Sequence, residues 1–277
     1  MRDVDQLVRQ TPLVAVGRFR CPPAHPRFAD SGPIRNHCFV FPRTASVIEH
    51  ESGDRFVGDQ TKVSLYNPGQ AYRRRSVSRE GDHSDYFVVT APLLREALAA
   101  RRLPSAEADD RRLFPRSHTP SRADLYLRQR RLFRASVSAH TDTFEVETGV
   151  LGLLDDVVCG MAGEARSVRP SQQRLVERAE ALLADRFARA LSLHDVAAEL
   201  DVSPFHLCRV FRAATSRTLH QHREQLRLRA ALNRLEGSDD ITTIALDCGY
   251  SSHSHFTAAF HKAFGIPPSI FRRCPQG

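Results

Sequence analysis

Residues that could do chemistry gather in one short stretch late in the sequence, DCGYSSHSHFTAAFHKAFG at 247–265. Phe256, Phe260 and Phe264 recur every fourth residue, a spacing that predicts one apolar face of a helix. The opposite face would carry imidazole and hydroxyl groups, which donate and accept hydrogen bonds. These groups belong to His253, Ser254, Thr257 and His261. We therefore expect this face to contact a polar partner.

Metal binding is a weaker interpretation of the same segment. His253 and His255 stand two residues apart, and side chains at that spacing point in different directions from a helix. The chain also holds six cysteines without a C-x-x-C pair, which argues against a zinc ribbon, a thioredoxin motif or a disulfide framework. They are Cys21, Cys38, Cys159, Cys208, Cys248 and Cys274. We expect reduced, buried thiols and neither a metal nor another cofactor.

The composition is that of a soluble globular protein. Of the 277 residues, 41% are hydrophobic and 26% are charged. No run approaches the roughly 18 apolar residues of a membrane helix, and the start, MRDVDQLVRQTPLVAVGRF, is unlike a secretion signal. We expect no membrane partner and a cytoplasmic location.

The net charge of +8 favours an anionic partner such as nucleic acid. Nearly all of the positive charge is arginine, with lysine only at Lys62 and Lys262. A coding bias would give the same composition, so the charge by itself leaves both explanations open.

Residues 35–90 are expected to form β structure. Short β-branched and aromatic runs are separated by turn signals at 67–69 and 79–82, which is typical of a small barrel or sandwich. The basic run AYRRRSV at 71–77 could bind an acidic effector or lie as a solvated strand end.

Helical spacing begins at Ala91, and three helices are expected within 91–163. The third carries an apolar stripe that must pack against the barrel or against the same helix of a second subunit. The stripe consists of Val150, Leu154, Val157, Val158 and Met161. Its period leaves the two alternatives open.

A polar, proline-punctuated stretch at 164–173 separates these helices from a last part of the chain that is helical throughout. We expect one domain over 1–165, a linker over 166–173 and a second domain over 174–277.

The second domain begins with a helix, a tight turn and another helix. Ser192 is placed to cap the first helix, residues 201–202 break it, and Ser203 with Pro204 begins the next. The side chains expected to be buried are Val196, Ala197, Leu200, Leu207, Val210 and Phe211. This arrangement predicts a helix-turn-helix, whose second helix lies in the major groove of DNA.

The same unit recurs about 48 residues later. Ile241, Ile244 and Ala245 would be buried on its first helix, Gly249 would end that helix, and Ser251 or Ser252 would cap the second. Between the units, residues 219–236 predict a connecting helix of roughly 25 Å at about 1.5 Å per residue. Two recognition helices held apart in this way could enter successive major-groove turns, about 34 Å apart.

Residues 174–273 resemble the DNA-binding domain of AraC-type transcription regulators. The elements that carry the resemblance are I-x-x-I-A, C-G-Y, S-H-F, F-x-K-x-F-G and P-S-x-F-R, all within 241–273. The preceding 165 residues resemble, more loosely, the cupin-like sensor half of such regulators. The implied fold is α+β, with a small cupin-like β-barrel and helices, then an all-α domain of two helix-turn-helix units joined by a linker helix.

The resemblance also implies which residues contact DNA. On the first recognition helix they are Ser203, Pro204, Phe205, His206, Cys208, Arg209 and Arg212. On the second they are Ser252, His253, Ser254, Thr257, Ala258, His261 and Lys262. Arg209 is the candidate for pairing with guanine, and Arg212 is expected to meet phosphate. Ala258 stands where the family often has arginine, so the second helix is expected to read bases only modestly.

The residues implied to form the structural core of the motif pack behind these faces. They are Ala197, Leu207, Phe211, Ile244, Ala245, Cys248, Gly249, Phe256, Phe260, Phe264 and Gly265. The implied partners are promoter DNA, RNA polymerase as for an activator, an unknown small-molecule effector, and a possible second copy of the chain. Effector binding would change the dimer geometry or release an inhibitory contact.

Two other classes of protein are alternatives. A metal-dependent cupin enzyme needs clustered ligands, but the candidates His37, His50, Glu51, His83 and Asp85 lack the H-x-H spacing, and adjacent strand residues face opposite ways. An alkylation-repair protein sharing this DNA-binding half would need an N-terminal cysteine cluster, which the sequence lacks. We expect no catalytic residues and no enzyme.

Overall fold

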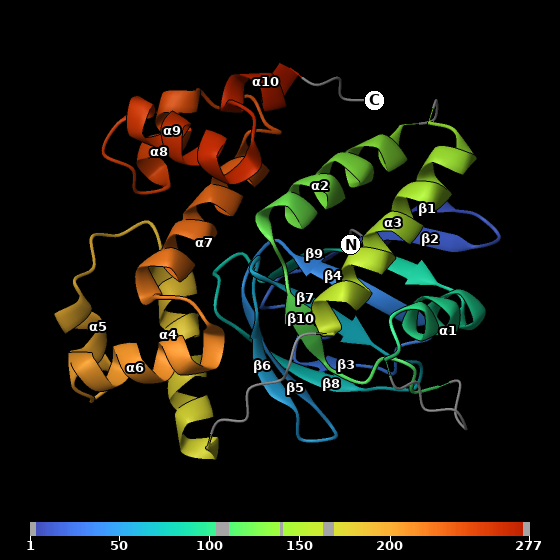
Figure 1. Ribbon diagram of the computed structural model, residues 1–277, viewed down its shortest axis with the longest axis horizontal. Coiled ribbons are helices and arrows are strands. Elements are labelled where there is room, and N and C mark those ends of the chain that lie inside the picture. The colour runs from blue at the N-terminus through green and yellow to red at the C-terminus, as the bar shows by residue number, and fades with distance from the viewer. Residues whose placement is uncertain (1–3, 104–110, 139–140, 163–168, 274–277) are drawn as a thin grey trace. The chain divides into compact units, whose positions relative to one another are not determined.

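The computed structural model describes residues 4–103, 111–138, 141–162 and 169–273. They fall into two units, one within residues 1–164 and the other within residues 165–275 (Figure 1). Of the predicted linker, 166–168 lies outside the described residues and 170–173 is helical, because Pro170 starts a helix at a position where its missing N–H costs nothing. In the described part of the chain, no helix has both the length and the apolar character needed to cross a bilayer.

The first unit contains two antiparallel sheets. One has six strands in the order β1-β2-β9-β4-β7-β10, and the other has four in the order β3-β8-β5-β6. The strands of the first sheet are β1 (Asp5–Gln10), β2 (Val14–Cys21), β9 (Asp82–Val89), β4 (His37–Pro42), β7 (Lys62–Tyr66) and β10 (His118–Pro120). Those of the second are β3 (Asp30–Ser31), β8 (Tyr72–Ser76), β5 (Ser46–His50) and β6 (Arg55–Gly58).

The predicted closed barrel is not confirmed, because the described strands form two separate hydrogen-bonded sheets. Residues of both sheets line one cavity, so the arrangement is that of a sandwich. β structure also begins earlier than the predicted residue 35. Strand β1 was missed because its residues, DQLVRQ, are exposed or half-buried and show no apolar run. Strand β2, VAVGRFRC, does begin with an apolar run, so its signal was present in the sequence.

Helices α1 (Ala91–Ala100), α2 (Ala123–Val137) and α3 (Thr143–Met161) follow, as the helical spacing predicts. The apolar stripe of α3 is buried against α1, α2 and β10, so it packs within its own unit (Figure 1). On the side of β9 away from the cavity, buried Asp85 pairs with Arg130 and accepts a hydrogen bond from Gln129 at 3.1 Å. These contacts fix α2 to the six-stranded sheet.

The second unit is all-α, as predicted. Its helices are α4 (Pro170–Arg186), α5 (Leu193–Glu199), α6 (Pro204–Thr215), α7 (Leu219–Arg234), α8 (Ile241–Asp247), α9 (His253–Phe264) and α10 (Pro268–Arg273). Five of them begin at a polar residue whose side-chain oxygen accepts a backbone N–H of the first turn. These caps are Ser192, Ser203, Thr218, Asp240 and Ser252.

The turns between these helices use left-handed backbone. Asp201 has φ +57°, which lets the chain leave α5 and enter α6 within a few residues. Gly249 at φ +85° follows α8, and Gly265 at φ +73° ends α9. The two glycines differ in surroundings: a Cβ at Gly249 would lie 2.4 Å from the carbonyl oxygen of Ala188, whereas nothing lies within 4 Å of one at Gly265.

This difference predicts unequal costs for two alanine substitutions. Gly265→Ala should lower the free energy of unfolding by about 1 kcal/mol, the cost of left-handed backbone. Gly249→Ala should cost about 2–4 kcal/mol, because the methyl group also displaces backbone. Urea denaturation of the full chain, followed by circular dichroism at a helical wavelength, measures both. Equal losses would contradict the close contact with Ala188.

Candidate functional site

The first helix pair, α5 and α6, packs on α4. Ser192 Oγ accepts from the Asp195 N–H at 3.1 Å, and the Asp195 carboxylate accepts from the Ser192 N–H at 3.0 Å, so the start of α5 is closed reciprocally. The Asp195 carboxylate also accepts from the Ser192 hydroxyl at 2.7 Å, and this hydrogen bond together with that from the Ser192 N–H lowers the pKa of Asp195. The buried side chains are Ala197, Leu200, Leu207, Val210 and Phe211, packed with Leu175, Val176, Ala179 and Leu182 of α4.

The outward side of α6 is open to solvent. Cys208, Arg209 and Arg212 are exposed, and Pro204 and His206 are half-buried. Phe205 is 78% exposed in the first turn of the helix, next to its cap Ser203. The residues assigned to DNA on this helix thus lie on an accessible face, which carries the guanidinium groups of Arg209 and Arg212 and the aromatic ring of Phe205.

The second pair, α8 and α9, repeats the arrangement with a different core. Phe256, Phe260 and Phe264 are buried with successive ring centroids 5.5 and 4.6 Å apart. Ile244 and Ala245 are buried as expected, whereas Ile241 is only half-buried. The N-cap Asp240 accepts from the N–H groups of two following threonines, and these hydrogen bonds lower its pKa.

Cys248 packs at the end of α8 with 2% of its surface exposed, and burial raises the pKa of its thiol to about 11. It therefore stays protonated near neutral pH, which does not suit a redox sensor. All cysteines in the described residues are free thiols, but the expectation that all are buried is wrong for Cys159 and Cys208, which are exposed. Cys274 lies outside the described residues.

The outward side of α9 exposes His253, Ser254 and Ala258, and the cap Ser252 is exposed as well. Further along the helix His261 and Lys262 are exposed. Two residues differ from the expectation. Thr257 is half-buried, and its hydroxyl has no hydrogen-bond partner among the described residues. Gly265 is exposed and serves to end the helix rather than to pack.

The two histidines at H-x-H spacing have different surroundings. His253 is exposed at the first position of α9, whereas the ring of His255 lies 5.5 Å from that of Tyr250, with its Nδ1 3.4 Å from the hydroxyl of Ser251. Within the described ranges, no group of three or more His, Cys, Asp or Glu side chains could hold a metal ion.

Helix α7 is joined to the end of α4, which supports the first pair, by arginine side chains that the sequence did not single out. Arg223 and Arg227, one turn apart, both donate through Nε to the carbonyl oxygen of Phe187, at 3.0 and 2.8 Å. Arg223 also donates to the carbonyl of Leu191 at 3.3 Å. Because Phe187 caps the C-terminal end of α4, the guanidiniums satisfy carbonyls that the helix leaves unpaired and sit where its dipole favours a cation.

The same helix face is joined to the second pair. The guanidinium of Arg227 lies 5.8 Å from the ring centroid of Tyr250, and the Tyr250 hydroxyl donates to Glu224 at 2.9 Å. Burial and the Glu224 carboxylate raise the pKa of Tyr250, so it remains a donor. We call Arg223, Glu224, Arg227 and Tyr250 the α7 clamp. The sequence offered one signal for this clamp, the C-G-Y element, because its tyrosine is Tyr250, which is 4% exposed.

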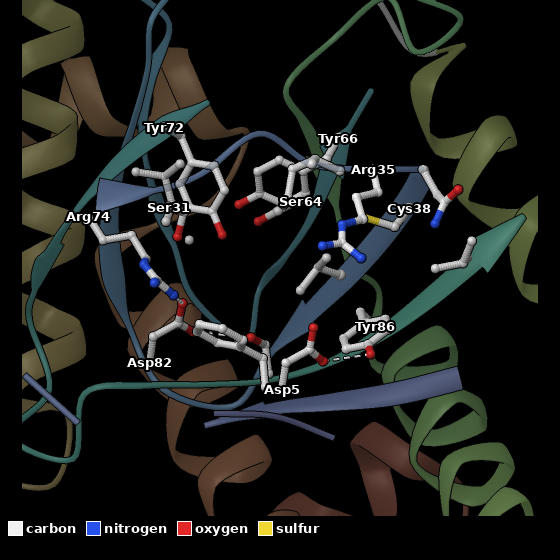
Figure 2. Close-up of a pocket in the computed structure, with 18 of the residues that line it drawn as sticks. Asp5, Ser31, Arg35, Cys38, Ser64, Tyr66, Tyr72, Arg74, Asp82 and Tyr86 are labelled. Carbon is white, nitrogen blue, oxygen red and sulfur yellow. Dashed lines mark hydrogen bonds and ion pairs between the residues drawn. The ribbon is translucent and has the colours of Figure 1, made fainter. Parts of the chain in front are cut away.

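The first unit offers a second candidate site, a cavity of about 960 Å³ between its two sheets (Figure 2). Its wall includes the ion pair of Arg74 with Asp82, at 2.5 Å, and the rings of Tyr66, Tyr72 and Tyr86. Arg73 and Arg75 of the basic run 71–77 are exposed, as expected for a solvated strand, whereas Arg74 is 3% exposed and paired with Asp82 and so is not a free anion site.

The candidate ligands of the cupin-enzyme alternative are spread over β4, β5, β9 and the segment after β5, and only His83 and Asp85 share a strand. His37 packs against Phe114 with ring centroids 6.2 Å apart, His50 lies among Phe56, Tyr66 and Tyr72, and Asp85 pairs with Arg130. Glu51 is exposed and His83 is half-buried. The structure does not bring them together as ligands of one ion.

Residues 196–273 match a family model described as a helix-turn-helix domain. Among curated proteins, the chain is 35% identical over 94 residues to the HTH-type transcriptional activator RhaS of Escherichia fergusonii, a match that covers 34% of each protein. It is 39% identical over 92 residues to RhaS of Pectobacterium carotovorum, covering 32% of this chain and 28% of that protein. The chain thus spans about a third of the length of the curated relatives it matches.

Among solved structures, the C-terminal domain of AraT, a response regulator from Geobacillus stearothermophilus, is 30% identical. That alignment covers 36% of this chain and 85% of that one, with a TM-score of 0.35. ToxT from Vibrio cholerae aligns over 95% of this chain and 98% of its own at 11% identity and a TM-score of 0.38. Both TM-scores are too low to establish a common fold for the whole chain.

The α7 clamp predicts that losing Arg227 uncouples the two helix pairs. Arg227→Ala should lower the free energy of unfolding by about 1–3 kcal/mol, because it removes a charged donor to a helix-end carbonyl. Amides of α8 and α9 should then exchange with deuterium faster than in the parent chain, while those of α5 and α6 change less. Mass spectrometry of the full chain resolves the two segments.

Arg178→Ala is the matched control, since it removes an equally charged but exposed side chain of α4. Arg227→Lys keeps the charge but loses the planar fork, so its effect should be intermediate. Identical exchange in Arg227→Ala and Arg178→Ala would contradict the coupling role.

Proposed function

Because residues 196–273 form a helix-turn-helix domain of the AraC type, we propose that this chain is a sequence-specific, DNA-binding transcription regulator that responds to a small molecule. The observation that supports this most is the pairing of two capped helix pairs on one connecting helix, each with an accessible second helix. An activator role follows the named relatives, which are transcriptional activators.

In this proposal α6 and α9 are the recognition helices. Helix α7 has 16 residues and so a length of about 24 Å, and the α7 clamp holds both pairs to it. Two helices held at a fixed distance would enter successive major grooves on one side of a duplex. The site is therefore a two-part surface whose parts act together.

The accessible side chains suggest what each helix would do. Arg209 can pair with O6 and N7 of guanine, and Phe205 can contact a thymine methyl group. Arg212, a turn further along α6, is assigned to phosphate. On α9 the short side chains of Ser254 and Ala258 offer little reach to base edges, so this helix would contribute mainly phosphate and methyl contacts.

The first unit would act as the sensor. Its cavity offers the space for a small effector. We assign this unit the role of the cupin-like sensor domain, although its strands form two sheets. A possible homodimer would carry the signal by changing its geometry, and RNA polymerase would be the second macromolecular partner. Binding promoter DNA requires a cytoplasmic location.

Arg209→Ala tests the base-reading role. We expect specific binding to weaken by roughly 1–3 kcal/mol and the preference at one base pair to disappear. Duplexes selected by the parent chain from a random library, each then varied at single positions, give the specificity profile of the variant. An unchanged profile would remove Arg209 from base recognition.

Arg212→Ala should behave differently because phosphate contacts carry no sequence information. Affinity should fall for all duplexes alike, and the slope of log affinity against log salt should become shallower by about 1. Fluorescence anisotropy across a salt series measures both quantities. If the parent chain bound DNA independently of salt, the proposed interface would be wrong.

A further inference from the structure

The cavity of the first unit has a wall specific enough to indicate the chemical class of its ligand. This inference rests on the sensor role proposed above. The cavity is lined from the six-stranded sheet by Tyr66 of β7 and Tyr86 of β9, and from the four-stranded sheet by Tyr72 and Arg74 of β8. In Figure 2 the rings of Tyr66 and Tyr72 lie along one side of the cavity, and the side chains of Asp82 and Tyr86 lie along the other.

The deepest charges of the wall are already satisfied. Arg74 donates to Asp82 at 2.5 Å and to the carbonyl of Phe28 at 3.0 Å, and its guanidinium lies 4.5 Å from the ring centroid of Phe19. The second Asp82 oxygen accepts from Ser84 at 3.1 Å. This pair neutralises itself and needs no ligand charge.

The remaining charges leave a positive excess. Three guanidiniums and two carboxylates line the cavity: Arg27, Arg35, Arg74, Asp5 and Asp82. Asp5 accepts a hydrogen bond from Tyr86 at 2.7 Å. Arg35, by contrast, is an exposed residue of the segment before β4 that makes no hydrogen bond or ion pair with the other residues that the structure describes, and Figure 2 shows its guanidinium reaching into the cavity. It is the group that an incoming anion would meet.

Two hydroxyl groups of the wall can also donate to a ligand. Tyr66 is 4% exposed and lines the cavity, where its hydroxyl is available to a ligand. Burial raises the pKa of Tyr66 well above its usual value, so the hydroxyl keeps its proton and can donate. Ser46 is 2% exposed, and its hydroxyl lacks a partner among the described residues. A buried donor without a partner is costly, and a ligand oxygen would satisfy it.

The rest of the wall is apolar or aromatic. Besides the tyrosine rings it contains Phe19, Val40, Ile48 and Val88. The rings of Tyr66 and Tyr72 lie 4.9 Å apart with an angle of 37° between them, so they offer a broad aromatic surface. Such a surface favours a hydrophobic ligand body.

We propose that this cavity binds an organic monocarboxylate with an apolar body. Its carboxylate pairs with the planar fork of Arg35, a hydroxyl of Tyr66 or Ser46 donates to a ligand oxygen, and the body lies against the tyrosine rings. A neutral, hydroxyl-rich ligand such as a sugar fits less well, because it would gain no ion pair with Arg35 and would place polar groups against the aromatic surface.

Isothermal titration calorimetry of the full chain tests the class with matched probes. The probes are benzoate, 4-phenylbutanoate and octanoate, each compared with benzyl alcohol, 4-phenylbutanol or octanol, and D-xylose as the neutral polyol. We expect at least one carboxylate to bind about tenfold or more tightly than its alcohol. Binding of none of the three acids, equal binding of acid and alcohol, or binding of xylose alone would each overturn the proposal.

Variants locate the bound probe. Arg35→Ala should weaken carboxylate binding roughly 10- to 100-fold and leave alcohol binding unchanged. The control Arg75→Ala removes an exposed guanidinium of β8, and Arg75 does not line the cavity. Equal weakening by both variants would reduce the effect to surface charge and overturn the role of Arg35. The chain has five tyrosines and no tryptophan, and three of the tyrosines line the cavity, so a bound probe should also change tyrosine fluorescence.

Duplex binding by the same proteins, measured both with and without carboxylate, separates this inference from the proposed function, and the parent chain counts as not binding DNA only if it fails in both conditions. If the parent chain binds DNA but no carboxylate, the ligand class is wrong and the regulator role stands. If a carboxylate binds through Arg35 but the parent chain does not bind DNA, the regulator role is wrong and the cavity assignment stands.

Discussion

The C-terminal unit depends on hydrogen bonds from two arginines of one helix to the carbonyl end of another. Helices α5 and α8 have seven residues each, too short to be stable alone, so each helix pair needs an external support. Helix α7 provides it on both sides, through Arg223 and Arg227 to the end of α4 and through Glu224 and Arg227 to Tyr250. These polar contacts, together with the buried Leu226, Leu228 and Leu232 of α7, set the relative placement of the two accessible helices.

Much of this unit could be predicted because its signals are local. A capping serine accepts a hydrogen bond from a backbone N–H only three residues further along the chain, and a left-handed turn involves only neighbouring residues. The burial of Phe256, Phe260 and Phe264 follows from the helical period. The α7 clamp could not be predicted in the same way. It joins residues 36 and 40 positions apart through side chains to backbone oxygens, and a carbonyl has no residue type that a pattern could reveal.

The N-terminal unit was predicted less well for a related reason. Period-2 alternation indicates a strand but not which strands share a sheet, so a barrel and a sandwich give the same pattern. In β8 three successive arginines hide the alternation altogether, although only Arg74 points inward. The cavity is assembled from strands far apart in sequence, and the unpaired state of Arg35 is visible only in three dimensions.

The central claim is that α6 and α9 act as one rigid two-part reader, and a spacing series tests it most directly. Starting from a duplex selected by the parent chain, five base pairs are inserted between the segments protected by α6 and by α9, and affinity is measured at constant salt. The account predicts that half a helical turn reduces affinity to the level of a single half-site, because α7 cannot follow the displaced groove. Affinity that is indifferent to the insertion would show two independent or flexible contacts and would contradict the account.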